Sequence, residues 1–164
     1  MKLIKANKDE YNLYKTHVLG DPSVNEFLAD YTYPGEALFF MQINLSEYNF
    51  CGLDEGVLYV FFDLSGYYSE EYNELSLCPM AYHITDSYEY ILDDFNEGHD
   101  IEGYDVMYLL DKGEGIEIDE NSIIIIDNNL LDFFLNFTQK VNKVTLSFEK
   151  IEHNRFCEGI FKIE

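Results

Sequence analysis

The sequence predicts a single α+β domain over residues 1–164, with a strand-dominated mixed or antiparallel sheet and about three helices. Three observations support this fold class. The chain of 164 residues is long enough for one hydrophobic core. It is 47% apolar, with thirteen Phe and fourteen Tyr, whereas disordered acidic chains are poor in such residues. Most apolar segments are short runs of β-forming residues bounded by turn signals.

Two of these runs predict central strands. Ala37–Leu45 reads ALFFMQINL, and Val57–Leu64 reads VLYVFFDL. Each follows a turn signal that contains glycine. Both runs are too apolar for an exposed edge, so we expect adjacent strands covered on both faces. Phe40 and Phe61 should then lie out of solvent.

Five further segments have strand character. Val144–Ile151 alternates apolar and polar residues and should form a hairpin with Cys157–Ile163. The complete set is Met80–Thr85, Tyr104–Leu110, Ser122–Asp127, Val144–Ile151 and Cys157–Ile163.

Three segments predict helices, namely Asn7–Val18, Asp21–Asp30 and Leu130–Lys140. In the first, Asn7 as N-cap and Glu10 three residues later have the spacing of a capping box. The second follows an Asp-Pro-Ser start signal. The third has apolar residues on one face, with Asn128 or Asn129 as N-cap.

Positive charge is absent from the middle of the chain. From Thr16 to Asp111 there is no Lys or Arg, while the same stretch carries twenty Asp and Glu. The formal net charge is −22, and a charge so far from zero opposes the compact state through self-repulsion. This pattern favours a strongly basic partner. Nucleic acid and anionic membranes are disfavoured as partners, because both attract Lys and Arg.

The cysteines and the N-terminus indicate a cytoplasmic protein. Cys51, Cys78 and Cys157 are odd in number and widely spaced, without a CxxC motif. This usage is typical of reduced thiols in the cytosol. The first residues lack the apolar region of a signal peptide, and no run has the length of a transmembrane helix.

The segment Leu38–Leu64 carries a family resemblance. Gln42–Leu45 reads QINL at the end of an apolar strand, and Glu55-Gly56 precedes a second strand with the sequence LYVFF over Leu58–Phe62. These motifs resemble the YwqG-like family, bacterial proteins of unknown function, over about a quarter of the chain. The resemblance implies a β-rich fold and no established catalytic residues. Some family members resemble immunity proteins encoded beside bacterial toxins.

The densest acidic run, from Asp93 to Glu102, has two interpretations. Paired carboxylates could perform acid–base chemistry, or the run could be a solvated loop, which its charge density favours. It does not fit the EF-hand pattern, and His99 has no second His or Cys at zinc spacing. No Gly-x-Ser-x-Gly motif or phosphate-binding loop occurs. We therefore expect no catalytic residue, no metal and no cofactor.

Six tyrosines are interspersed with carboxylates between residues 67 and 93. Tyr supplies contact area with a polar tip, and carboxylates attract Lys and Arg. Equally, half of these tyrosines could simply border the core. If the segment is an interface, its partner-binding residues are Tyr67, Tyr68, Glu70, Glu71, Glu74, Tyr90, Asp93, Asp94, Glu97, Asp100 and Glu102.

These observations favour a non-enzymatic binding protein. The most concrete form is an immunity protein that neutralises a basic bacterial toxin, for example a nuclease, by covering it with an acidic surface. The alternative is a small-molecule-binding protein or enzyme with a pocket lined by aromatics of the central strands. An acidic domain adapted to high salt ranks last, because the abundant Ile, Asn and Tyr are not typical of halophiles.

Overall fold

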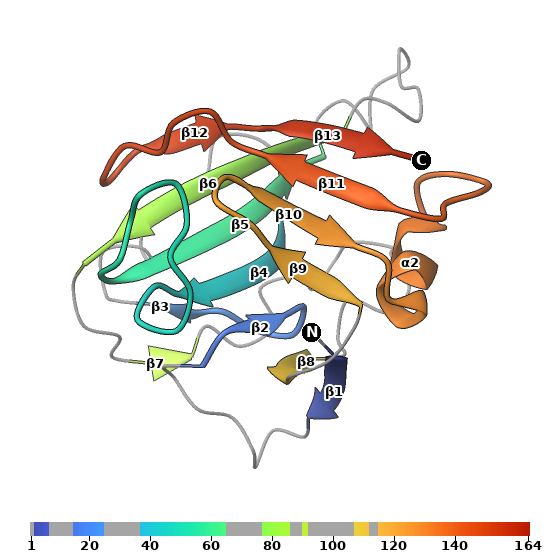
Figure 1. Cartoon of the computed structure of the whole chain (residues 1–164), viewed down its shortest axis with the longest axis horizontal. Coiled ribbons are helices and arrows are strands. Elements are labelled where there is room, and N and C mark those ends of the chain that lie inside the picture. Colours follow the sequence, from blue (N-terminus) through green and yellow to red (C-terminus); the bar gives the residue numbers. More distant parts are fainter. Residues whose placement is uncertain are drawn as a thin grey trace.

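Two large antiparallel sheets dominate the structure (Figure 1). The computed structural model describes residues 2–6, 15–24, 37–64, 77–85, 90–91, 107–111 and 115–164. The larger sheet has seven strands in the order β1-β8-β2-β4-β5-β6-β12. Their bounds are β1 Lys2–Ala6, β8 Met107–Asp111, β2 His17–Val18, β4 Ala37–Asn44, β5 Val57–Asp63, β6 Cys78–Ile84 and β12 Phe156–Glu158.

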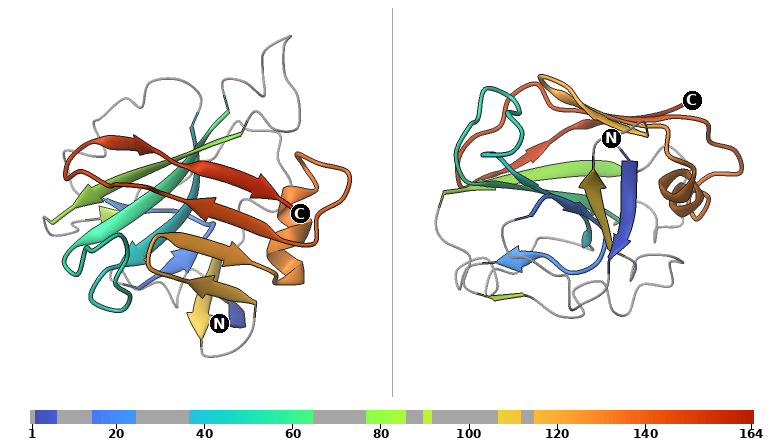
Figure 2. Two further views of the ribbon diagram at one scale, coloured as in Figure 1. Left: turned by 45° about the horizontal axis from the view of Figure 1, so that its top comes forward. Right: turned by 60° about the horizontal axis from the view of Figure 1, so that its bottom comes forward.

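The smaller sheet has four strands in the order β13-β11-β10-β9. It packs over the larger one as a second layer, with helix α2 (Asn128–Phe134) at one end of the sandwich (Figure 2). A separate two-stranded pair joins β3 (Ser23–Val24) to β7 (Tyr90–Ile91). The bounds of the four strands are β13 Ile160–Ile163, β11 Val144–Ser147, β10 Ser122–Ile125 and β9 Ile116–Ile118.

The two central strands are confirmed. β4 pairs antiparallel with β5 from Ala37↔Asp63 to Asn44↔Val57. Phe40 is fully buried and Phe61 is 3% exposed. A bulge in β4 leaves Phe40 between the paired residues Phe39 and Met41. The bulge places Phe40 and Met41 consecutively in the core between the sheets, so the alternation of faces shifts by one residue there.

Aromatic residues fill both faces of the larger sheet. Between the layers, Phe40 packs against Phe62 of β5 and Phe134 of α2, with ring centroids 5.1 and 5.6 Å apart. On the opposite face, Phe61 packs against Phe39 and Phe156 at 5.9 and 6.1 Å. The aromatic rings of the central strands are therefore closed core.

The C-terminal strand segment divides between the two sheets. The expected pairing with Val144–Ser147 is confirmed for β13, which pairs antiparallel with β11. However, β12 leaves this hairpin and pairs with β6 of the larger sheet. The switch occurs at Gly159, whose N–H donates to the Pro79 carbonyl at 2.8 Å. A Cβ at Gly159 would lie 2.5 Å from the Phe148 ring, so the crossing requires glycine.

The third predicted helix is confirmed with different bounds. Asp127, rather than Asn128 or Asn129, is the N-cap, and its carboxylate accepts from the N–H groups of Asn129 and Leu130. The helix ends at Phe134 instead of Lys140. A side-chain amide of Asn136 donates to the Phe133 carbonyl at 2.7 Å and closes the last turn.

The other two predicted helices are corrected where the structure describes them. His17–Val18 is strand β2 and Ser23–Val24 is strand β3. Each makes long-range pairs that outweigh local helix signals, since β2 lies between β4 and β8. The remaining residues of both segments lie outside the described part. That part contains one helix, which is too short to cross a membrane.

Candidate functional site

The partner-binding residues predicted from sequence lie outside the described residues, with one exception. Tyr90 is in β7, where its backbone pairs with Val24, and nothing is described of its side chain. The set from Tyr67 to Glu102 therefore stays a prediction. A described group of exposed carboxylates lies elsewhere in the same lysine-free stretch and just beyond it.

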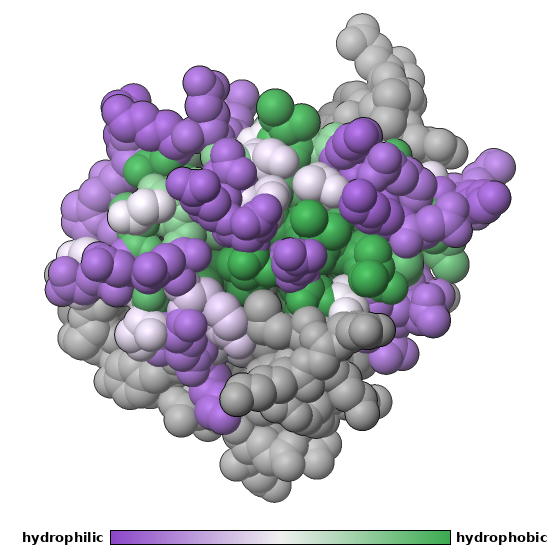
Figure 3. Space-filling view, in the orientation of Figure 1, coloured by the Kyte–Doolittle hydropathy of each residue, from purple (hydrophilic) through white to green (hydrophobic). Residues whose placement is uncertain are grey.

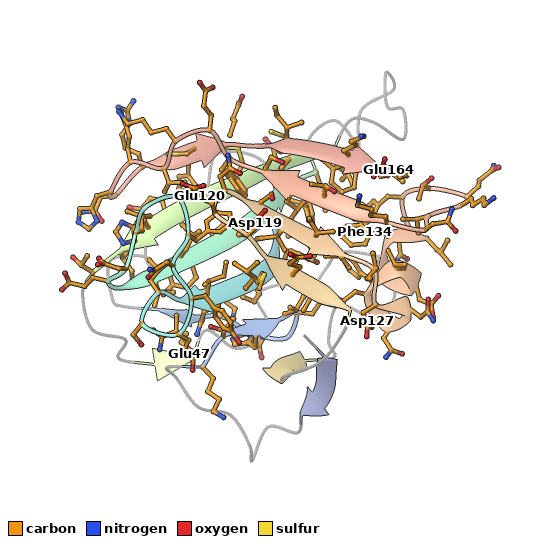
Figure 4. All side chains as sticks on the ribbon, in the orientation of Figure 1. Glu47, Asp119, Glu120, Asp127, Phe134 and Glu164 are labelled. Atoms are coloured by element: carbon orange, nitrogen blue, oxygen red, sulfur yellow. The ribbon has the colours of Figure 1, made fainter. Side chains whose placement is uncertain are left out.

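This surface, which we call the acidic edge, consists of five exposed carboxylates. Glu47, Asp54 and Glu55 come from the β4–β5 loop, and Asp119 and Glu120 come from the β9–β10 turn. Figure 4 shows Asp119 and Glu120 at the end of the β9–β10 hairpin that points away from α2, with Glu47 below them on the neighbouring loop.

Short backbone contacts fix the β4–β5 loop. Asn44 starts a tight turn in which its carbonyl accepts from the Glu47 N–H at 2.9 Å. Phe50 and Leu53 exchange two backbone hydrogen bonds, and Cys51 between them has a φ of +52°. At the end of the loop, Gly56 has a φ of +87°, and a Cβ there would lie 2.0 Å from the Ile84 carbonyl oxygen. These contacts hold the loop carboxylates on a rigid base.

A backbone hydrogen bond joins the two acidic segments. The Cys51 N–H donates to the Glu120 carbonyl at 2.6 Å. Within the turn, the Glu120 N–H donates to the Asp119 carboxylate at 2.8 Å. Glu47 is anchored separately, because its carboxylate accepts from the N–H and the hydroxyl of Thr16 at 3.1 and 2.6 Å. The loop and the turn therefore present their charges from one connected surface.

The ion pairs of the described residues lie in another region. All four join residues of the C-terminal segment: Lys143–Glu164, Lys150–Glu152, Arg155–Glu152 and Lys162–Glu164. No carboxylate of the acidic edge forms an ion pair with a described Lys or Arg. The acidic edge thus presents negative charge that no described Lys or Arg neutralises, and such charge attracts cationic side chains of another molecule.

Two thiols are unsuited to nucleophilic chemistry. Burial raises the pKa of Cys51 to about 11, with smaller contributions from Cys157 and Glu120. Burial also raises the pKa of Cys78, again with help from nearby acidic residues. A nucleophilic cysteine needs the opposite shift, since the thiolate is the reactive form. The three cysteines are free thiols.

A histidine pair is an arrangement that sequence reasoning missed. His83 of β6 and His153 of the β11–β12 connection are seventy residues apart in the chain, yet their Nδ1 atoms are 3.4 Å apart. No second histidine lies within ten residues of either one in the sequence. The pairing of β12 with β6 and a parallel bridge between the two histidines bring them together.

The outer face of the four-stranded sheet carries both hydrophobic and hydrophilic side chains. Hydrophobic residues gather at its centre, with hydrophilic residues around them (Figure 3). Ile160 and Ile126 are 71% and 53% exposed. Ile124 of β10 lies between Glu117 and Thr145 in the sheet register.

Sequence reasoning did not select the acidic edge as a site. Two features of the sequence could have indicated it. The β4–β5 loop contains no Lys or Arg, and its glycines predict turns at the surface. The contribution of Asp119 and Glu120 depends on a contact across about seventy residues of sequence, which no local pattern encodes.

Comparisons with known proteins give no match. No protein-family model matches the chain, and neither a curated protein nor a solved structure is similar to it at a significant level. The resemblance of Leu38–Leu64 to the YwqG-like family stays a prediction.

Proposed function

We propose that this chain is a non-enzymatic binding protein for a basic protein, in the manner of an immunity protein that neutralises a bacterial toxin. The observation that carries the proposal is the acidic edge, whose five carboxylates have no ion pair within the described residues. Its three loop carboxylates lie within the stretch Thr16–Asp111, which has no Lys or Arg, and its two turn carboxylates follow shortly after that stretch. A nuclease with a basic groove is one partner of suitable charge.

The mechanism is electrostatic steering followed by occlusion. Opposite fields accelerate encounter between an acidic and a basic surface, and this acceleration falls steeply with salt. The rigid loop and turn then cover the basic surface of the partner. The half-buried Tyr48 lies on the same loop and packs partly against the core, so its ring is held in place for contact with Lys or Arg.

The sequence also predicts that the acidic run Asp93–Glu102 takes part in binding the basic partner. It contributes five carboxylates in ten residues and no basic residue. Together with the tyrosines at 67, 68 and 90, it forms the second part of the proposed interface.

Capture and neutralisation test this proposal. The chain is used to purify its partner from the native organism, and the partner is identified and its charge determined. We expect a basic protein whose expression inhibits growth, and we expect co-expression of the chain to restore growth. A captured partner that is not basic, or whose toxicity persists in the presence of the chain, would contradict the proposal.

A further inference from the structure

The imidazole rings of His83 and His153 face each other through one nitrogen atom of each ring. The two Nδ1 atoms lie 3.4 Å apart, with ring centroids at 5.1 Å and ring planes inclined by 70°. The Nδ1 atoms thus approach from two different elements, β6 and the β11–β12 connection. The ring of His83 is nearly buried, while His153 is exposed.

A backbone carbonyl fixes the tautomer of His83. Its Nε2 lies 2.8 Å from the Glu55 carbonyl oxygen, which can only accept, so Nε2 carries the hydrogen. In the neutral ring Nδ1 then has an unprotonated lone pair directed towards His153. Histidines that bind metals commonly use their second nitrogen in this way, with an N–H donated to a carbonyl.

The backbone holds the second histidine in place. The N–H of Asn154 donates to the carbonyl of His83 at 3.0 Å, and the two histidines form an isolated parallel bridge. Next to His153 in sequence, the Glu152 carboxylate pairs with both Arg155 and Lys150, at 2.8 and 3.6 Å.

The separation of 3.4 Å is long for a hydrogen bond between two nitrogens. By contrast, two imidazole nitrogens bound to one tetrahedral Zn²⁺ at about 2.0–2.1 Å lie about 3.3–3.4 Å from each other. We propose that the Nδ1 atoms of His83 and His153 bind one divalent transition-metal ion of the class that prefers imidazole, such as Zn²⁺, Ni²⁺ or Cu²⁺.

The site would have two protein ligands and open positions. The described residues contain no group of three or more His, Cys, Asp or Glu arranged to hold a metal. Water completes the coordination sphere, and the ion remains accessible through the exposed His153. A bound ion would also tie the β11–β12 connection to β6, so it should stabilise the folded chain by mass action.

Zinc titration of matched variants tests the inference. The full chain, free of any affinity tag, is titrated with Zn²⁺ in metal-free buffer by calorimetry. We expect one equivalent to bind, and we expect His153→Gln to weaken its affinity more than tenfold. His153 is exposed, so this variant should retain the fold. His99→Gln is the control, because it removes a histidine from the acidic run and leaves the pair intact; its affinity should equal that of the wild type.

Nitrogen NMR of the histidine rings identifies the ligand atoms. Zinc should shift the Nδ1 resonances of His83 and His153 and leave the Nε2 resonance of His83 in its protonated range. The inference is overturned if His153→Gln binds zinc as tightly as the wild type. It is also overturned if His99→Gln abolishes binding, or if neither Nδ1 resonance moves.

Discussion

At the scale of single residues, burial of polar groups at β2 has a measurable consequence. His17 is 1% exposed, and its Nδ1–H donates to the Leu19 carbonyl at 3.0 Å. Burial lowers the pKa of His17 from 6.5 to about 4, against the opposing effects of the bonds to Leu19 and Gln42. The neutral ring is therefore part of the folded structure.

The pH dependence follows from the direction of this shift. Between pH 6.5 and 4 the unfolded chain takes up a proton at His17 that the folded chain does not. The free energy of unfolding must therefore fall as pH decreases through this window, and the contribution is constant above it. The largest effect of this one group is about 3 kcal/mol.

We predict that His17→Asn removes this contribution, because its amide can donate to Leu19 but cannot take up a proton near neutral pH. Urea unfolding at pH 7 and pH 4.5 should show a smaller loss of stability for the variant, by about 2 kcal/mol. Equal losses for variant and wild type would show that His17 does not titrate as its burial requires.

At the scale of elements, the sequence predicted those strands and the helix that a local pattern of apolar residues defines. The apolar runs at Ala37–Leu45 and Val57–Leu64 were long and dense enough to define adjacent central strands, and helix α2 followed from its periodicity. Two expected helices were wrong where they are described, since β2 and β3 are formed by partners far away in sequence. The acidic edge and the histidine pair also depend on contacts between residues that are far apart in the sequence, which local patterns do not predict.

The division of the C-terminal strand segment between β12 and β13 depends on Gly159. A methyl group there would overlap the fully buried ring of Phe148 and approach the Ser147 carbonyl at 2.7 Å. We predict that Gly159→Ala lowers the free energy of unfolding by roughly 2 kcal/mol, as in overpacked cores.

Gly52→Ala provides the comparison for this prediction. A methyl group at Gly52 would meet no atom within 4 Å, although the φ of +74° makes alanine strained there. Its cost should therefore be smaller, about 1 kcal/mol. Chemical denaturation measures both variants, and a Gly159→Ala protein as stable as the wild type would contradict the close packing at Phe148.

At the scale of the whole molecule, the net charge of −22 is the dominant feature. The four ion pairs of the described residues are between partly exposed side chains and contribute little individually. Repulsion among the remaining carboxylates should therefore dominate the response to salt.

We predict that the melting temperature rises by a few degrees as NaCl increases from about 20 to about 300 mM, because screening reduces this repulsion. Calorimetry without divalent cations measures it, and a falling melting temperature would show that attractive pairs dominate.

Charge reversal within the second proposed part of the interface gives a further prediction. The double variant Asp93→Lys with Asp94→Lys should leave the fold intact or slightly more stable, because it relieves repulsion in a stretch without basic residues. Circular dichroism and thermal unfolding measure this effect. A loss of folded structure would mean that these carboxylates make structural contacts rather than a solvated surface.

The central claim is that the acidic edge steers a basic partner, and association kinetics test it most directly. Glu120→Lys alters the acidic edge, whereas Asp132→Lys makes the same change of charge at an exposed position of α2, away from the β9–β10 turn (Figure 1). The association rate with the captured partner is measured by stopped flow at about 50 and about 300 mM NaCl. We predict that Glu120→Lys slows association and flattens its salt dependence, while Asp132→Lys has a clearly smaller effect on both. Equal effects of the two variants, or no effect of either, would contradict the claim.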